Sequence, residues 1–289
     1  MSKGDRQNII IADSDALDRF IKTDNTHVLH ALYDRAVVPE QVYREMTREQ
    51  SPREVREWMS RQREEGDWLR VDADPLHNPA PARSRGWGEK QAIELGRRYQ
   101  QSGEYKEVTM LLEDKVAVRR AQEALQLPVT RGLFVLEEAD RHGLIQPLPE
   151  EIKRLQQLPV NYKNERLHVD GKMVPVTDYL IERHYQRQEQ LGRLDIRSME
   201  GTNPDRRDFI AAFPSGKQAR FSVGGLAEGE DVRGLITFHH YERLEQQTES
   251  QVLNLKVDGA QQQTYSHSET HTETHVESET HTQSHTVKF

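Results

Sequence analysis

The stretch Val108-Thr109-Met110-Leu111-Leu112-Glu113-Asp114-Lys115 decides the fold expected for the first half of the chain. Its apolar and β-branched residues are typical of a strand buried in a parallel sheet, and two acids follow them. Sites in open α/β sheets form just beyond the carboxyl ends of strands, so Asp114 is a candidate functional residue. Glu113 should point to the opposite face if the strand continues that far, which gives it a structural role.

A second strand of the same kind lies near the start of the chain. The apolar run Asn8-Ile9-Ile10-Ile11-Ala12 is followed by Asp13-Ser14-Asp15. A predicted helix comes next, with Leu17 and Phe20 on one face. Asp13 directly follows the strand and is therefore the second candidate, although capping this helix is an equally simple role for it.

Strands and helices alternate through the first half of the chain. The remaining predicted strands span residues 36–38, 68–71 and 127–130, and the remaining predicted helices span 28–33, 40–48, 52–65, 89–101, 132–142 and 150–158, with one more beginning at Lys115. This alternation predicts an α/β domain, an open parallel sheet with helices on both faces.

Two more acids lie on these predicted helices. Glu45 is one turn beyond Gln41, and Glu89 falls in the first turn of the helix that it opens. Both have ordinary explanations, because a helical Glu is usually solvated and acids favour the positive end of the helix dipole.

In a doubly wound sheet, Asp13, Glu45, Glu89 and Asp114 can converge on one edge. Clustered carboxylates repel one another unless a cation neutralises them. Oxygen ligands without His or Cys suit Mg²⁺ or Mn²⁺. One or two such ions can orient and deprotonate a water for attack on a phosphodiester and stabilise the leaving oxygen.

Residues 8–148 resemble the PIN-domain nucleases, and most closely the bacterial branch that includes toxin-like members. The resemblance rests on blocks in the family's order and spacing, which are residues 9–17, 37–46, 86–95 and 112–121, continued by 127–136 and 141–145. It implies a PIN-like fold and a Mg²⁺- or Mn²⁺-dependent endoribonuclease whose metal-binding acids are matched by Asp13, Glu45, Glu89 and Asp114. Ser14 stands where the family often has Thr and keeps the hydroxyl. The resemblance also suggests a toxin or defence effector, with RNA as substrate and a protein inhibitor or antitoxin as partner.

Four basic residues lie near the candidate acids in the sequence, namely Lys90, Lys115, Arg119 and Arg120. They are candidates for phosphate contacts, which position a nucleic acid without reading its sequence. Pairing with neighbouring acids or with solvent explains each of them equally well.

The second half divides into a β-rich module and a tail, which gives expected domains of 1–160, 161–260 and 261–289. The module reads as a hairpin over 167–176, a helix over 178–191, a second hairpin over 208–223 and a strand over 232–241. This pattern predicts a small α+β fold. His239 and His240 should point to opposite faces of that last strand, which argues against a shared metal.

The tail is low in complexity and alternates two kinds of residue. His or acidic and amide residues occupy every second position, with Ser, Thr or Val between them, and the histidines considered for binding are His267, His271, His275, His281 and His285. Three interpretations remain open: a disordered tail, a strand in an oligomeric β-stack, or a tail that binds Zn²⁺, Ni²⁺ or Cu²⁺.

Composition limits the classes of function. The net charge of −8 argues against coating nucleic acid non-specifically, and the lack of Cys excludes disulfides and thiolate metal sites. The chain has no run of about 20 apolar residues and no secretory signal, so we expect a cytoplasmic protein without a membrane segment. The alternative to a nuclease is a non-catalytic PIN-like scaffold whose C-terminal part forms a homo-oligomer or binds metal. The residues do not separate RNA from DNA as substrate.

Overall fold

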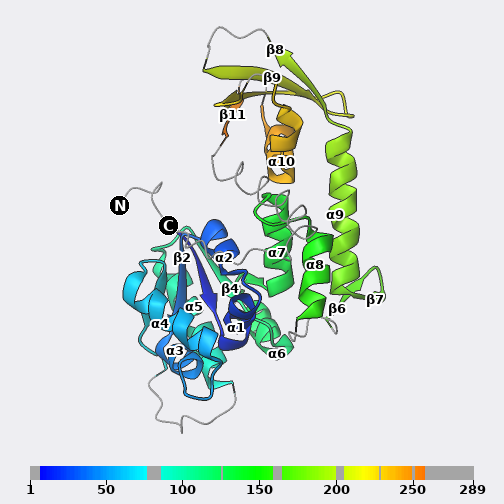
Figure 1. The fold of residues 1–289 in the computed structure, drawn as a ribbon. Helices are drawn as coiled ribbons and strands as arrows, with labels where there is room; N and C mark the ends of the chain where they lie inside the picture. The colour runs from blue at the N-terminus through cyan, green and yellow to red at the C-terminus, as the bar shows by residue number, and fades with distance from the viewer. Residues whose placement is uncertain are drawn as a thin grey trace, which may run out of the picture. The chain divides into compact units, whose positions relative to one another are not determined.

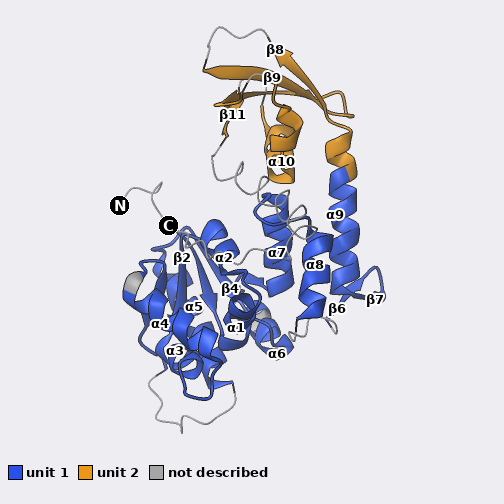
Figure 2. Ribbon diagram, viewed as in Figure 1, with its two compact units in different colours: residues 1–188 blue, residues 189–289 orange. Residues whose placement is uncertain are grey.

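The computed structural model describes residues 7–76, 86–124, 126–158, 165–199, 205–227, 229–248 and 251–257. The chain forms two compact units, residues 1–188 and 189–289 (Figures 1 and 2). The expected boundary near residue 160 falls in 159–164, outside the described residues. The first unit continues beyond it because Val176 and Leu180 are buried in the core of that unit.

The first unit contains a five-stranded parallel sheet in the order β3-β2-β1-β4-β5. The strands are β1 (Asn8–Ala12), β2 (Arg35–Pro39), β3 (Leu69–Asp72), β4 (Glu107–Leu111) and β5 (Val129–Thr130). The helices between and after them are α1 (Ser14–Lys22), α2 (Thr26–Leu32), α3 (Glu40–Met46), α4 (Arg53–Glu65), α5 (Trp87–Ser102), α6 (Lys115–Arg119) with the π-helical turn η1 (Arg120–Ala124), α7 (Gly132–Arg141) and α8 (Leu148–Gln157). Each of these elements was expected from the sequence, with ends within about two residues, as is usual for element boundaries.

Alternation along the strands sends side chains to two hydrophobic cores. Ile10 and Ala12 of β1 pack with α1, α2 and α7, whereas Ile9 and Ile11 pack with α5 and α6. All four side chains are at most 1% exposed, so both faces of the sheet are covered. This confirms the expected parallel sheet with helices on both faces.

The strand order reverses between β1 and β4, the two neighbours at the centre of the sheet. Their carboxyl ends are tied together by a hydrogen bond of 3.2 Å from the Asp13 amide to the Leu111 carbonyl. Such a reversal point is where open α/β sheets bind ligands, because the connecting segments diverge there. The residues that follow β1 and β4 are therefore placed to form a site.

The first unit ends with a hairpin and most of a long helix, whose residues after 188 belong to the second unit. The hairpin pairs β6 (Arg166–Val169) with β7 (Lys172–Pro175), and it leads into α9 (Val176–Gly192). Asp170 and Gly171 have φ of 48° and 79°, which is the left-handed geometry of a tight two-residue hairpin turn. The hairpin confirms the expectation from the Asp-Gly sequence.

The second unit is a four-stranded sheet in the order β11-β10-β9-β8, with one helix packed against it. Its elements are β8 (Asp195–Met199), β9 (Arg206–Ala212), β10 (Gln218–Gly224), the 3₁₀ turn η2 (Val232–Leu235), α10 (Phe238–Gln246) and β11 (Val252–Lys256). The expected hairpin over 208–223 is confirmed as β9 and β10. The strands β8 and β11 were not expected from the sequence.

The strand expected over 232–241 is wrong, because this segment forms η2 and the start of α10. Thr237 and His240 make a reciprocal capping box, in which each side chain bonds the backbone N–H of the other. This local arrangement initiates a helix in a short apolar run whose pattern also suits a strand. His239 and His240 therefore lie on a helical turn, and the argument that a strand separates them does not hold.

None of the helices in the described ranges combines the length and the apolar composition needed to cross a membrane.

Candidate metal centre

Asp13 is buried at the end of β1 and is only 5% exposed. It is the N-cap of α1, and its Oδ1 accepts a hydrogen bond of 2.8 Å from the Ala16 amide. Burial raises the pKa of Asp13 to about 7, helped by the charges of Asp15, Glu113 and Glu89, while the hydrogen bond from Ala16 lowers it. Asp13 is therefore both the cap of α1 and one of the four predicted metal-binding acids.

Asp114 lies three residues beyond Leu111, the last residue of β4, and its side chain is exposed. It caps α6, with Oδ1 accepting from the amides of Val116 at 2.8 Å and Ala117 at 3.0 Å. Both hydrogen bonds reach Oδ1, so they fix the orientation of the carboxylate at the start of α6.

Glu45 approaches the same edge from α3, the helix that follows β2. Its Oε1 accepts from Nε2 of Gln41 at 2.8 Å, and its Oε2 accepts from Oγ of Ser14 at 3.3 Å. A Cβ atom on Gly88 would lie 2.7 Å from that Oε2, so the backbone at the start of α5 lies directly against this carboxylate. Ser14 links Glu45 to the segment that carries Asp13.

Glu89 lies in the first turn of α5 and is partly exposed. Burial raises its pKa, and the charges of Asp114 and Asp15 raise it further, while Arg120 and Lys90 lower it. Its electrostatic neighbours therefore come from α1, α5 and the segment that follows β4.

The structure thus places the four predicted acids at one edge of the sheet and couples three of them electrostatically. Glu89 raises the pKa of Asp13, and Asp114 raises the pKa of Glu89. Such mutual repulsion between carboxylates is relieved by a cation, so the chemistry of this donor set fits a hard divalent ion. Among the described residues, no three His, Cys, Asp or Glu side chains already lie close enough to hold an ion together. Binding would therefore require the long side chains of Glu45 and Glu89 to turn towards it.

The four residues predicted to contact phosphates are all exposed; they are Lys90, Lys115, Arg119 and Arg120. Lys90 lies on the first turn of α5 and the other three on α6 and η1, next to Asp114. Lys90 and Arg120 both act on the pKa of Glu89, so positive charge lies at the border of the acidic set.

Glu113 is buried and belongs to a network of four charges that the sequence did not reveal. Its Oε2 lies 3.1 Å from Arg19 and 3.7 Å from Arg131, and its Oε1 accepts from the Gly132 amide at 2.9 Å. Glu165 completes the network at 3.0 Å from Arg19 and 3.1 Å from Arg131. The structural role expected for Glu113 is the role seen here.

The partners in this network are distant in the sequence: Glu113 is 94 positions after Arg19, and Glu165 is 146 positions after it. No local pattern marks them. Gly88, in contrast, lay inside a block already singled out in the sequence.

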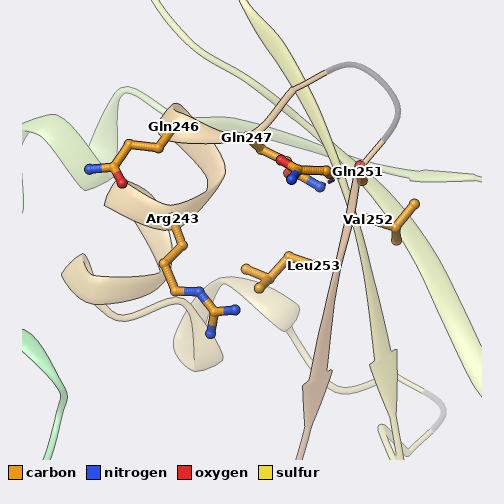
Figure 3. Close-up of a pocket in the computed structure, with 6 residues that line it drawn as sticks. All are labelled: Arg243, Gln246, Gln247, Gln251, Val252 and Leu253. Carbon is orange, nitrogen blue, oxygen red and sulfur yellow. Dashed lines mark hydrogen bonds between the residues drawn. The ribbon is translucent and has the colours of Figure 1, made fainter. Parts of the chain in front are cut away.

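The second unit contains an open cavity of about 410 Å³, lined by Arg243, Gln246, Gln247, Gln251, Val252 and Leu253 (Figure 3). The lining side chains come from α10, from β11 and from the residues that flank them. Amides, one guanidinium and aliphatic groups do not form a catalytic set, so this cavity adds nothing to the chemistry of the acids. The predicted tail histidines lie outside the described residues.

A family model for the PIN domain matches residues 9–169, which is more than half of the chain. PIN domains are generally nucleases, and they usually use divalent metal ions. Among curated proteins, none matches the chain.

Proposed function

Because the chain belongs to the PIN-domain family, we propose that its first unit is an endoribonuclease that hydrolyses phosphodiester bonds with Mg²⁺ or Mn²⁺. The supporting observation is the electrostatic coupling of Asp13, Glu89 and Asp114 at the point where the strand order reverses. Acids that raise one another's pKa values destabilise the metal-free site, and a bound cation removes that cost.

In this proposal Asp13, Glu45, Glu89 and Asp114 hold the ion. The hydrogen bonds to Oδ1 of Asp13 and Asp114 orient both carboxylates before an ion arrives. A divalent ion held by these residues would lower the pKa of a water molecule, so that the water can lose a proton and attack phosphorus as hydroxide, and would stabilise the leaving oxygen. Asp13 must release its proton for this, because its raised pKa keeps a share of the metal-free protein protonated near neutral pH.

The exposed basic residues on α5, α6 and η1 position the substrate by contacts with phosphates. Their local charge offsets the negative charge of the whole chain, which is −8. Binding should therefore weaken as salt rises, since each phosphate contact releases counterions from the nucleic acid.

The test compares cleavage of a labelled RNA by the wild type and by Asp114→Asn, with Mg²⁺, with Mn²⁺ and with a chelator. Asp178→Asn is a matched control, because Asp178 is also exposed in the first turn of a helix in this unit but follows no strand of the central sheet. We expect metal-dependent cleavage by the wild type and Asp178→Asn, and at least a 100-fold loss in Asp114→Asn. Equal cleavage by wild type and Asp114→Asn would refute the site, and preferential cleavage of DNA of the same sequence would refute the substrate.

The family resemblance extends the proposal to a toxin or defence effector controlled by a protein inhibitor. Induced expression in a bacterial host should then arrest growth with the wild type and not with Asp114→Asn. Growth arrest by both proteins would show that toxicity does not depend on Asp114.

A non-catalytic scaffold is the competing function, and the regular alternation of residues 267–286 is the observation that favours it. It predicts an oligomer that is lost when residues 261–289 are deleted. Light scattering of the full-length and shortened chains decides this point independently of any cleavage assay.

A further inference from the structure

The four-stranded sheet of the second unit is covered on one side only. Phe209, Phe221 and Leu253 pack with α10 in the core of this unit, and the residues that alternate with them point to the other side. Figure 1 shows α10 against one side of the sheet, and none of the described helices and strands of the second unit lies on the opposite side. We call that opposite side the open face.

Each of the four strands contributes one basic side chain to the open face. These residues are Arg197 of β8, Arg206 of β9, Arg220 of β10 and Lys256 of β11. The first and third both pair with Ile210, and the second and fourth both pair with Gly224, so the four cations form two rows across the sheet. Strands lie about 4.8 Å apart and residues rise about 3.3 Å along each, so the cations of one row are about 10 Å apart and the rows about 13 Å apart.

Gly224 leaves room for a cation to cross the sheet. Because it has no side chain, the guanidinium of Arg206 reaches over β10 and donates a hydrogen bond to Oδ1 of Asn254 on β11. This contact holds the positive charge of Arg206 on the surface of the open face.

Two acids share the open face without neutralising it. Asp195 pairs with Arg197 at 2.6 Å, and Asp208 accepts a hydrogen bond from Ser222. Within the described ranges, Arg220 and Lys256 form no ion pair, and both are exposed. The strands therefore give this face a net positive charge, although the whole chain carries −8.

We propose that the open face binds the phosphates of RNA and so provides a second binding surface for the substrate of the first unit. This inference rests on the proposed nuclease function, and the surface lies outside residues 9–169, which the PIN-domain model matches. Because one chain carries both units, RNA held on the open face has a raised local concentration at the acids.

The chemistry of the face favours phosphates over bases. A nucleic acid carries one charge per nucleotide, so several cations fixed on one surface gain free energy by releasing its counterions. The strand residues that form the open face include no aromatic side chain on which a base could stack. Contacts with phosphates position a strand without reading its sequence, so two RNAs of different sequence should bind equally.

The test measures binding by the full-length chain in a chelator, over a range of salt concentrations. Fluorescence anisotropy with a labelled single-stranded RNA compares the wild type with the double variant Arg220→Glu/Lys256→Glu. The double variant Arg233→Glu/Arg243→Glu is the matched control, because it changes the net charge equally at exposed residues of η2 and α10 in the same unit. Thermal unfolding verifies that each variant is folded, and Arg220→Gln/Lys256→Gln repeats the measurement without reversing charge.

We expect the variant of Arg220 and Lys256 to bind RNA roughly 10-fold more weakly than the wild type. The slope of log Kd against log salt should fall by about 1.4, since each phosphate contact with a single strand contributes about 0.7. The control variant should keep the wild-type slope. In cleavage with Mg²⁺, the variant of the open face should have a raised KM and an unchanged kcat, because it loses binding that the ground state and the transition state share.

Unchanged affinity of the open-face variant would overturn the proposal. An equal loss in the control variant would also overturn it, by showing that net charge alone sets the affinity. Vesicles of phosphatidylserine and phosphatidylcholine test a lipid surface, and vesicle binding that needs Arg220 and Lys256 in a chain that does not bind RNA would refute the RNA assignment. RNA binding through the open face by a chain that cleaves equally with and without Asp114 would instead refute the nuclease site and leave this surface established.

Discussion

The carboxylate of Glu45 lies against the backbone of Gly88, so close that a Cβ atom there would be 2.7 Å from its Oε2. Gln41 and Ser14 donate hydrogen bonds to the same carboxylate. Three segments that follow different strands therefore set the position of one acid. The close contact with Glu45 is what favours glycine at residue 88. Its φ angle is not positive, so the backbone conformation alone would allow another residue.

Gly88→Ala should displace Glu45 and lower cleavage about 10- to 100-fold, because a shift of about 1 Å in a catalytic group has effects of that size. Stability should change little, since the displaced atoms are at the end of a flexible side chain. Single-turnover cleavage and thermal unfolding measure the two effects. Gly192→Ala is the control, because a Cβ atom at that helical glycine meets open space. Unchanged cleavage by Gly88→Ala would show that the position of Glu45 is unimportant.

Mg²⁺ or Mn²⁺ should stabilise the folded protein, because only the folded chain brings the acids together. An ion at a concentration of about 100 times its dissociation constant adds about 2.7 kcal/mol to the free energy of unfolding. Thermal unfolding with and without a chelator will show this as a rise in Tm. Asp114→Asn should lose most of this rise and Asp178→Asn should keep it. A rise of equal size in Asp114→Asn would place the ion elsewhere.

The stability of the metal-free protein should fall as pH rises through the titration of Asp13. Burial raises the folded-state pKa of Asp13 from its ordinary value of 3.8 to about 7. A raised folded-state pKa contributes stability that is fully present below about pH 4 and is lost as pH approaches 7. At 1.36 kcal/mol per pKa unit, the loss between about pH 5 and pH 8 is about 3 kcal/mol.

Asp13→Asn removes this titration, so its free energy of unfolding should decline less than that of the wild type over the same range. Urea unfolding in chelator at the two pH values measures the difference. Parallel pH profiles for the two proteins would contradict the raised pKa of Asp13.

Glu165→Ala should destabilise the first unit by roughly 3 kcal/mol, because it leaves Arg19 and Arg131 with one buried carboxylate between them. Glu150→Ala is the matched control, since its ion pair with Lys153 is more than half exposed on both sides and contributes little to stability. Urea unfolding measures the loss in free energy of unfolding for both variants. Equal losses would show that the buried network contributes no more than an exposed ion pair.

Gly96→Ala should destabilise the second of the two cores by about 1–3 kcal/mol, because its Cβ atom would overlap Sδ of Met110. The double variant Gly96→Ala with Met110→Ala should lose less stability than the sum of the two single losses, since the two side chains compete for one space. Additive losses would show that the residues are not in contact.

Most of the first unit was predictable because its signals are local. The apolar runs of β1 and β4 are buried on both faces, and Asp13 and Asp114 cap the helices that follow them. The second unit was less predictable. Thr237 and His240 begin a helix where the apolar spacing favoured a strand, and β8 and β11 are edge strands with weak patterns of their own.

The sequence by itself determined which residues are acidic, which runs form the five-stranded sheet of the first unit, and that Asp114 follows one of them. The sequence also suggested a structural role for Glu113, but only the tertiary structure decided which charges bury it. Glu113 is buried because Arg19, Arg131 and Glu165, from distant parts of the chain, surround it with charges and hydrogen bonds. Asp114 remains exposed at the cap of α6, where Glu89 lies within electrostatic range. The physical reason is that burying a charge requires partners in space, and local sequence does not specify those partners.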